Sequence, residues 1–224
     1  MNISLILQMA ADTEPERIGL VCDARRWSYG ALLRAARGAA LNISASGCAY
    51  VALLDESSAA AAVALFGAAI AGVPYVPLNY RLPDTDLDAL LSRIAPAYVI
   101  GDADRIRQLS PGDRHVVQAR AAFVAEAERA GEAAPGTDDP TESIAVQLFT
   151  SGTTAAPKAA LLRHGNLLSY ILGHGRVRYG CSRRSRAGQR AALSQDRFPV
   201  CRVSGNPFAL TVPHTGQRFI VRSH

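Results

Sequence analysis

The sequence lacks three features that would place it in a common class: closely spaced cysteine pairs, a secretory leader and a long apolar run. Its cysteines are Cys22, Cys48, Cys181 and Cys201. These spacings are too wide for a CxxC metal pair. Residues 1–9 have neither a basic start nor a cleavage site, which predicts a cytoplasmic protein with free thiols. The most apolar stretch, residues 59–71, is shorter than the roughly 20 residues of a membrane span, so we expect a buried helix there.

Lysine is almost absent, and acidic residues nearly disappear from the last part of the chain. Residues 175–224 hold ten arginines, no lysine and a single acidic residue, Asp196. Residues 1–174 hold 14 basic and 18 acidic residues and are therefore net negative, although the whole chain has a formal charge of +5. The basic balance belongs to the tail, so it does not indicate a nucleic-acid-binding domain in the body.

Apolar periodicity in residues 1–174 alternates between short strands and helices. The predicted strands are 18–22, 26–28, 50–54, 74–78, 98–100, 115–117, 144–149 and 159–162. The predicted helices begin after Ser28, Ser57 or Ser58, Asp84 and Asn166 as caps, with one more over 121–130. Strands separated by helices of about ten residues predict an α/β fold with a doubly wound, mostly parallel sheet and flanking helices. Residues 131–141, rich in Gly, Pro and Asp, are the predicted linker.

One segment, LFTSGTTAAPK at residues 148–158, combines features suited to binding phosphate. A predicted strand leads into a turn rich in hydroxyl groups, and the turn ends in the only lysine of the chain. Hydroxyls and turn amides donate to phosphate oxygens, a glycine lets the backbone approach a ligand, and lysine adds a mobile positive charge. The candidate residues are Thr150, Ser151, Gly152, Thr153, Thr154 and Lys158.

The alternative for this segment is an ordinary Ser/Thr-rich turn on a β-hairpin. The segment is not a Walker A loop, because that loop needs a glycine directly before the lysine and Ser or Thr after it. Here Pro157 precedes Lys158 and Ala159 follows it. The physics of the loop alone leaves both interpretations open.

The same segment resembles the phosphate-binding signature of the adenylate-forming, or AMP-binding, superfamily, and within it the acyl-CoA synthetases and fatty-acid–CoA ligases. Three upstream segments are also similar to that family: WSYGALL at 27–33, VPLNYRL at 76–82 after Ala71-Gly72, and PAYVIGD at 96–102. The resemblance covers about residues 10–174 in the family's order. It implies that residues 1–174 are a partial, N-terminal portion of the adenylate-forming fold.

The resemblance implies a ligase that joins a carboxylic acid to the α-phosphate of ATP with Mg²⁺ and then passes the acyl group to a thiol, such as that of coenzyme A. It also implies that Thr150, Ser151, Gly152, Thr153, Thr154 and Lys158 bind ATP through its β- and γ-phosphates. No catalytic residue and no metal ligand is identified in this sequence. Ala155 and Ala159 stand where the family commonly has glycine, and a Cβ at Ala155 disfavours a left-handed turn. His164 is expected to begin or pack a helix rather than to act as a base.

Periodicity stops after residue 174, which predicts that residues 175–224 form a basic tail that is disordered or translated out of frame. On this view the chain is truncated before the acyl pocket and most of the catalytic machinery, and it shows little activity alone. One alternative is a non-catalytic remnant or nucleotide-binding module with a basic tail. Another is a tail that binds nucleic acid or anionic membrane. Scattered aromatic residues and the lack of an amphipathic helix argue against the last alternative.

Overall fold

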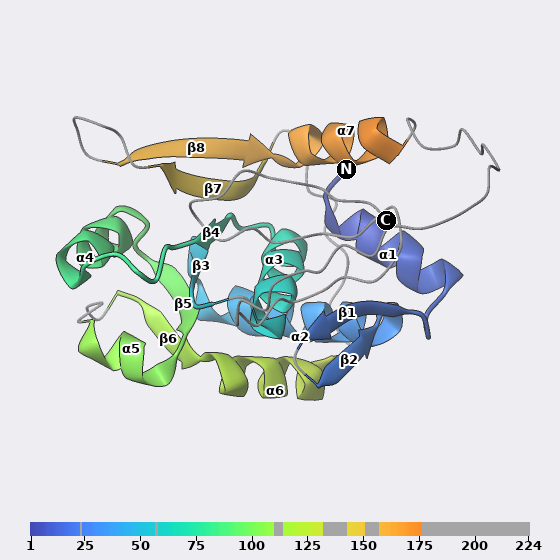
Figure 1. Ribbon diagram of the computed structural model, residues 1–224, viewed down its shortest axis with the longest axis horizontal. Coiled ribbons are helices and arrows are strands. Elements are labelled where there is room, and N and C mark those ends of the chain that lie inside the picture. The colour runs from blue at the N-terminus through green and yellow to red at the C-terminus, as the bar shows by residue number, and fades with distance from the viewer. Residues whose placement is uncertain (23, 57, 110–113, 132–142, 151–156, 176–224) are drawn as a thin grey trace, which may run out of the picture.

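The computed structural model describes residues 1–22, 24–56, 58–109, 114–131, 143–150 and 157–175. The helices in this part of the chain are α1 (Ser4–Thr13), α2 (Tyr29–Ser46), α3 (Ala59–Ala71), α4 (Asp84–Arg93), α5 (Ala103–Gln108), α6 (Arg120–Ala130) and α7 (His164–Gly175). The strands are β1 (Ile18–Cys22), β2 (Arg25–Ser28), β3 (Tyr50–Leu54), β4 (Tyr75–Pro77), β5 (Ala97–Gly101), β6 (Val116–Ala119), β7 (Ile144–Thr150) and β8 (Lys158–Arg163). Figure 1 shows how these elements are arranged.

The main sheet confirms the predicted α/β fold. Its six strands lie in the order β6-β5-β3-β4-β7-β8. The first five are parallel to one another, and β8 pairs with β7 in the antiparallel direction. The order runs outward from β3 in both directions, as in a doubly wound sheet. Strands β1 and β2 form a separate antiparallel pair.

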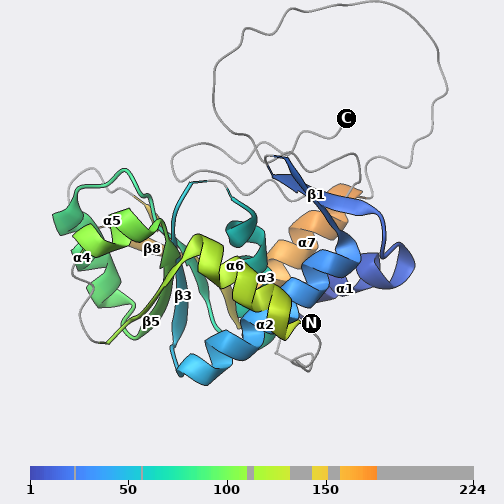
Figure 2. The same ribbon diagram turned by 90° about the horizontal axis from the view of Figure 1, so that it is seen from below.

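Alternate residues of each central strand face two different apolar cores. In β3, Val51 and Leu53 belong to the core shared with α2, α3 and α6, whereas Ala52 and Leu54 belong to the core under α4. Successive strand side chains point to opposite faces, so a strand covered on both faces is apolar throughout. Figure 2 shows α4 and α5 on one side of the sheet and α2, α3 and α6 on the other.

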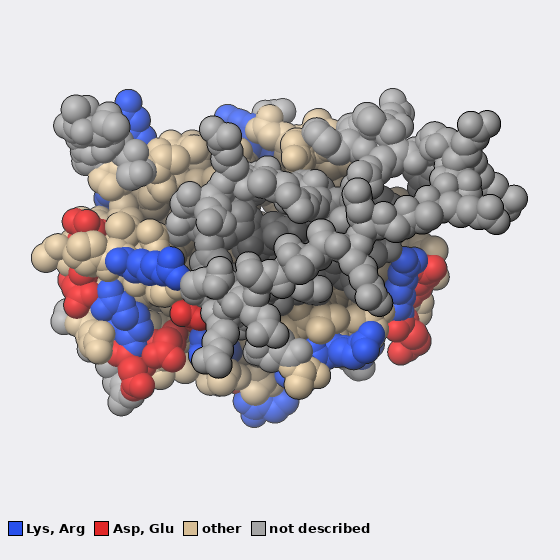
Figure 3. Space-filling model, viewed as in Figure 1, with Lys and Arg blue, Asp and Glu red and all other residues tan. Residues whose placement is uncertain are grey.

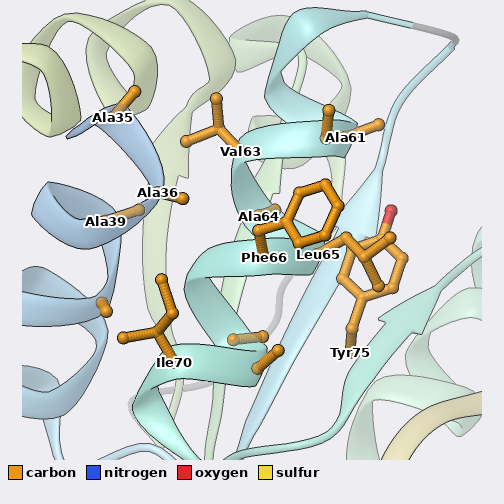
Figure 4. Close-up of a cluster of buried hydrophobic side chains, with 14 of the residues drawn as sticks. Ala35, Ala36, Ala39, Ala61, Val63, Ala64, Leu65, Phe66, Ile70 and Tyr75 are labelled. Atoms are coloured by element: carbon orange, nitrogen blue, oxygen red, sulfur yellow. The ribbon is translucent and has the colours of Figure 1, made fainter. Parts of the chain in front are cut away.

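Small residues bring α2, α3 and α6 close together. Figure 4 shows α3 packed between alanines of α2, such as Ala36 and Ala39, and Tyr75 of β4. The predicted buried helix at 59–71 is confirmed as α3, in which every residue from Ala60 to Ile70 is buried. A Cβ added at Gly38 of α2 would lie 2.0 Å from the carbonyl oxygen of Ala127 in α6. Glycine is therefore required at this crossing for α2 and α6 to approach as they do.

Of the four residues predicted to cap a helix, one lies at the N-cap and makes the expected side-chain hydrogen bond to the helix. Ser28 Oγ accepts a hydrogen bond from the Ala31 amide over 3.2 Å, which is a normal N-cap. Ser58 is the N-cap residue of α3, but its hydroxyl donates to the Asp55 carboxylate over 3.0 Å and makes no cap bond. Asp84 is the first residue of α4 and not its cap.

Asn166 was also predicted as a cap, and it lies inside the first turn of α7. Its side-chain oxygen accepts a hydrogen bond from the Arg163 amide over 3.1 Å, because the helix begins two residues earlier, at His164. This is the reverse half of a capping box, in which the third helical residue reaches back to the N-cap amide. Helices α1 and α5 were not predicted.

The described surface carries charges of both signs. Figure 3 shows acidic and basic side chains interspersed over the region of α4 and α5. Among the described residues, no helix is long and apolar enough to cross a membrane. The predicted linker at 131–141 falls almost wholly outside the described residues, and so does the predicted basic tail.

Candidate functional site

The candidate loop joins the two strands of the β7–β8 hairpin. Thr150 is the last residue of β7, and it pairs with Lys158, the first residue of β8. The Thr150 hydroxyl donates to the Lys158 carbonyl oxygen over 3.3 Å. The predicted hairpin is therefore confirmed, and its turn lies between two residues that the sequence had selected for phosphate binding.

The residues between Thr150 and Lys158, called the hairpin turn below, follow the carboxyl end of β7. Strand β7 is parallel to β4. The hairpin turn therefore belongs to the edge of the sheet where β3, β4 and β5 also end. In open α/β sheets, ligands bind outside the carboxyl ends of the strands. Thr150 and Lys158 are both exposed there, so their hydroxyl and ammonium groups are accessible to a ligand.

Only part of the predicted site can be compared with the structure. Thr150 and Lys158 are described and lie side by side across the hairpin. Ser151, Gly152, Thr153 and Thr154 lie outside the described residues, as does Ala155, where the family commonly has glycine. Their part in binding phosphate stays a prediction.

Arg93, which sequence reasoning missed, contacts both sides of the hairpin turn. Its Nη1 atom donates to the Pro157 carbonyl oxygen over 2.6 Å. Its guanidinium carbon lies 4.9 Å from the centre of the Phe149 ring. Arg93 is separated from Pro157 by 64 residues in sequence, and a basic residue in the last turn of a helix is common enough to attract no notice.

A buried carboxylate, Asp55, directly follows β3 at the same edge of the sheet. Its side chain is 2% exposed, and its oxygens accept hydrogen bonds from the Ser58 hydroxyl over 3.0 Å and from Arg120 Nη1 over 2.6 Å. Burial, and secondly the Asp55 charge, raises the pKa of the Tyr75 hydroxyl far above its usual value, so Tyr75 stays neutral. Because the Asp55 carboxylate already accepts hydrogen bonds from Arg120 and Ser58, we assign it a structural role and no role in binding a ligand.

The described residues do not offer a ligand set for the Mg²⁺ that the family resemblance implies. Within them, no group of three or more His, Cys, Asp or Glu side chains could hold a metal ion. Carboxylate and carbonyl oxygens are the ligands that Mg²⁺ uses in proteins. We therefore assign no step of the chemistry to a metal held by this part of the chain.

His164 has the structural role that the sequence suggested. It is 1% exposed, begins α7, and its Nδ1 atom accepts a hydrogen bond from the Ile3 amide over 3.3 Å. Asn2, the residue before Ile3, donates from its side-chain amide to the Ala69 carbonyl oxygen over 2.8 Å. His164 thus joins α7 to the start of the chain and does not face the hairpin turn as a base.

The two described cysteines, Cys22 and Cys48, are both buried free thiols, as predicted. Trp27 of β2 is also buried, 2% exposed, with the Arg25 guanidinium 4.2 Å from its ring centre. Strands β1 and β2, which hold Cys22 and Trp27, lie apart from β7 and β8 in Figure 1. None of these residues adds chemistry to the candidate loop.

Comparison with known proteins shows the family to which this sequence is related. The family model described as AMP-binding enzyme matches residues 7–199. The nonribosomal peptide synthetase vlms of Lecanicillium sp is 32% identical over 130 residues, which are 57% of this chain and 2% of that protein. The match to the family model runs past residue 174, and the domain boundary predicted there stays a prediction.

Two solved structures share the fold. VinN in complex with 3-methylaspartate is 24% identical with a TM-score of 0.70, over 80% of this chain and 52% of that one. A fatty acyl CoA synthetase of Mycobacterium tuberculosis is 24% identical with a TM-score of 0.67, over 78% of this chain and 37% of that one. The chain thus spans about half or less of these proteins, and at such identities the likeness concerns the fold alone. Since the family model matches well over half of the sequence, this chain belongs to the AMP-binding, adenylate-forming family, whose members use ATP.

Proposed function

We propose that the loop at residues 150–158 binds the β- and γ-phosphates of ATP, and that the chain is the phosphate-binding portion of an acid–thiol ligase. The observation that carries this proposal is the hairpin geometry, which brings Thr150 and Lys158 together at the carboxyl edge of the sheet. Family membership supports the identity of the nucleotide.

The chemistry of the loop is neutralisation and orientation of the triphosphate. The Lys158 ammonium compensates the charge of the phosphates, and the Thr150 hydroxyl contributes a hydrogen bond when its single proton turns from the Lys158 carbonyl oxygen to a phosphate oxygen. Fixed donors at the places where charge develops lower the barrier without reorganising during the reaction. In the proposed reaction a carboxylate attacks the α-phosphate of ATP and pyrophosphate leaves, which gives an acyl-adenylate. A thiol of coenzyme A or of a phosphopantetheine arm then attacks the acyl carbon, the thioester forms, and AMP leaves.

The acid is the least determined part of the proposal. The peptide synthetase relative favours an amino acid or a related acid, and the resemblance of residues 148–158 to the acyl-CoA synthetases favours a fatty or aromatic acid. Both belong to the same two-step chemistry, with a carboxylate as the first nucleophile. Coenzyme A and a phosphopantetheine arm both present the thiol of the second step.

Replacing the single lysine tests the loop. We expect Lys158→Ala to weaken the binding of ATP and of inorganic tripolyphosphate about tenfold, measured by calorimetry, because a charged hydrogen bond to phosphate is lost. The matched control is Arg163→Ala, which removes an exposed positive charge from the other end of the same strand. Equal affinities in Lys158→Ala and the unchanged chain would mean that the segment is an ordinary hairpin turn.

A second candidate is a nucleotide-binding module without catalysis. It is favoured by the described residues, which include both strands of the hairpin but no cluster of metal ligands. Carboxylate-dependent exchange between ATP and pyrophosphate tests whether this chain catalyses the first step by itself. We expect the isolated chain to bind ATP and to exchange little pyrophosphate with amino, fatty or aromatic acids. Robust exchange with any of these acids would establish the ligase and refute the module.

A further inference from the structure

Among the described residues, the side chain of Arg93 contacts two hairpin positions at the base of the turn, Phe149 and Pro157. Arg93 is the last residue of α4, a helix fixed against the sheet by its buried residues Leu87, Leu90 and Leu91. Phe149 of β7 packs partly against the same apolar core. The helix therefore presents Arg93 to the hairpin from a rigid support.

Arg93 contacts the residue just before Thr150 and the residue just before Lys158. The guanidinium lies 4.9 Å from the Phe149 ring centre, and it donates to the Pro157 carbonyl oxygen over 2.6 Å. Only arginine combines a flat cation that stacks on a ring with several directed donors. A single group thus connects α4 to both strands at the base of the turn.

We propose that Arg93 is a positioning residue that anchors the base of this turn and so holds Lys158 in place for a triphosphate. The second half of the proposal rests on the phosphate-binding function proposed above. The first half concerns only the described contacts and can be tested without nucleotide. Arg93 acts through Pro157 and Phe149 and is not itself assigned a contact with phosphate.

The single lysine makes the test direct. Lys158 is the only lysine of the chain, so a lysine-specific protease cuts the protein at one place, beside the anchored residue. Under native conditions the rate of this cut reports how often the base of the turn opens. We expect Arg93→Met to accelerate the cut about tenfold, because one hydrogen bond and one cation–π contact are lost.

The matched control is Arg25→Met in β2. Arg25 also lies over an aromatic ring, that of Trp27 at 4.2 Å, and it pairs with Glu128, but it is remote from the hairpin turn. We expect this variant to be cut at the rate of the unchanged chain. Arg93→Lys keeps the charge and one donor but adds a second cleavage site, so it is compared only in the tripolyphosphate measurement below, where it should restore most of the affinity.

Tripolyphosphate supplies the second readout. In the unchanged chain it should slow the cut, and in Arg93→Met its dissociation constant should rise severalfold with the melting temperature nearly unchanged. A normal cleavage rate in Arg93→Met, or equal acceleration in Arg25→Met, would overturn the anchoring role. Failure of tripolyphosphate to bind the unchanged chain would instead refute the phosphate-binding function, while the cleavage rates still decide the role of Arg93.

Discussion

At the scale of single residues, His115 links the start of β5 to the segment that enters β6. Its Nδ1 atom accepts a hydrogen bond from the Ala97 amide over 3.2 Å. Burial lowers the pKa of His115 below its usual 6.5; the backbone contact at Ala97 offsets part of this decrease, and the neighbouring charge of Arg114 adds to it. A protonated Nδ1 cannot accept the bond from Ala97, so this hydrogen bond requires the neutral ring.

This residue should make stability depend on pH on the acidic side of neutrality. At pH values between the His115 pKa of about 6.5 in the unfolded chain and its lower pKa in the folded chain, the unfolded chain binds more protons. The contribution of His115 to the free energy of unfolding is therefore complete above this pH range and is lost as the pH falls through it. We expect His115→Gln to lose less stability than the unchanged chain between pH 7.5 and pH 5, with a difference below about 1 kcal/mol because the group is partly solvated. Urea unfolding at both pH values measures the loss of stability in each protein. Identical losses in the two proteins would contradict the role given to His115.

At the scale of elements, the crossing of α2 and α6 depends on the missing side chain at Gly38. A Cβ there would meet the Ala127 carbonyl oxygen at 2.0 Å, so Gly38→Ala must push the helices apart. We expect a loss of about 1–3 kcal/mol in the free energy of unfolding, in spite of the higher helix propensity of alanine. Fluorescence of the single tryptophan, Trp27, reports the unfolding.

The control for this crossing is Gly30→Ala in the same helix. Its added Cβ would lie 3.2 Å from the nearest atom, the Pro15 carbonyl oxygen, which is a far milder contact. We expect this variant to change stability much less than Gly38→Ala. Equal effects of the two substitutions would mean that helix propensity, and not the approach of α6, decides the outcome.

The sequence was most informative where a local pattern decides the structure. Strand β3 and helix α3 were predicted with their observed bounds, because continuous apolar runs between turn residues have few other solutions. Helices α1 and α5 were missed, since α1 lacks a cap side chain and α5 has only six residues. Ser58 is the N-cap residue as predicted, but its hydroxyl bonds to Asp55, a partner that tertiary structure selects. The caps at Asp84 and Asn166 were misassigned because their helices begin one or more residues earlier than the apolar pattern indicates.

In the candidate site, too, a local sequence pattern predicts some residues, whereas tertiary packing alone brings in others. Thr150 and Lys158 were predicted to bind phosphate because hydroxyls and a lone lysine after a strand are a local signal, and this role stays a prediction. Arg93 could not be recognised, because only the packing of α4 against the sheet brings it to Pro157. Residues that hold a loop from a distant element leave no mark in its own sequence.

At the scale of the whole molecule, the described fold leaves apolar side chains exposed at both edges of the main sheet. Val116 and Val117 of the edge strand β6 are 39% and 41% exposed, and Leu161 of the other edge strand, β8, is 50% exposed. Unpaired edge strands with exposed apolar side chains pair with other chains. The molecule is therefore expected to self-associate.

Charges placed on these edges should suppress self-association. We expect Val117→Lys combined with Leu161→Lys to lower the mean mass seen in sedimentation at high concentration and to raise solubility severalfold, since a lysine on an edge strand blocks pairing. Ser92→Lys together with Gln108→Lys adds the same charge at helical positions and is the control. Equal gains from both pairs would indicate a general effect of net charge.

The bonds of Asn2 and Ile3 also have a consequence for the order in which the fold can close. Ile3 reaches its partner, His164, across 161 residues of sequence. A ribosome adds about 5–20 residues per second, so this partner follows Ile3 by roughly 8–30 seconds during synthesis. During that interval the apolar residues of α1, such as Leu7, can already pack against α2 and α3, whereas α7 is not yet made. The hydrogen bond between Ile3 and His164 is therefore among the last contacts of the described fold to form, and it joins α7 to a core that is already assembled.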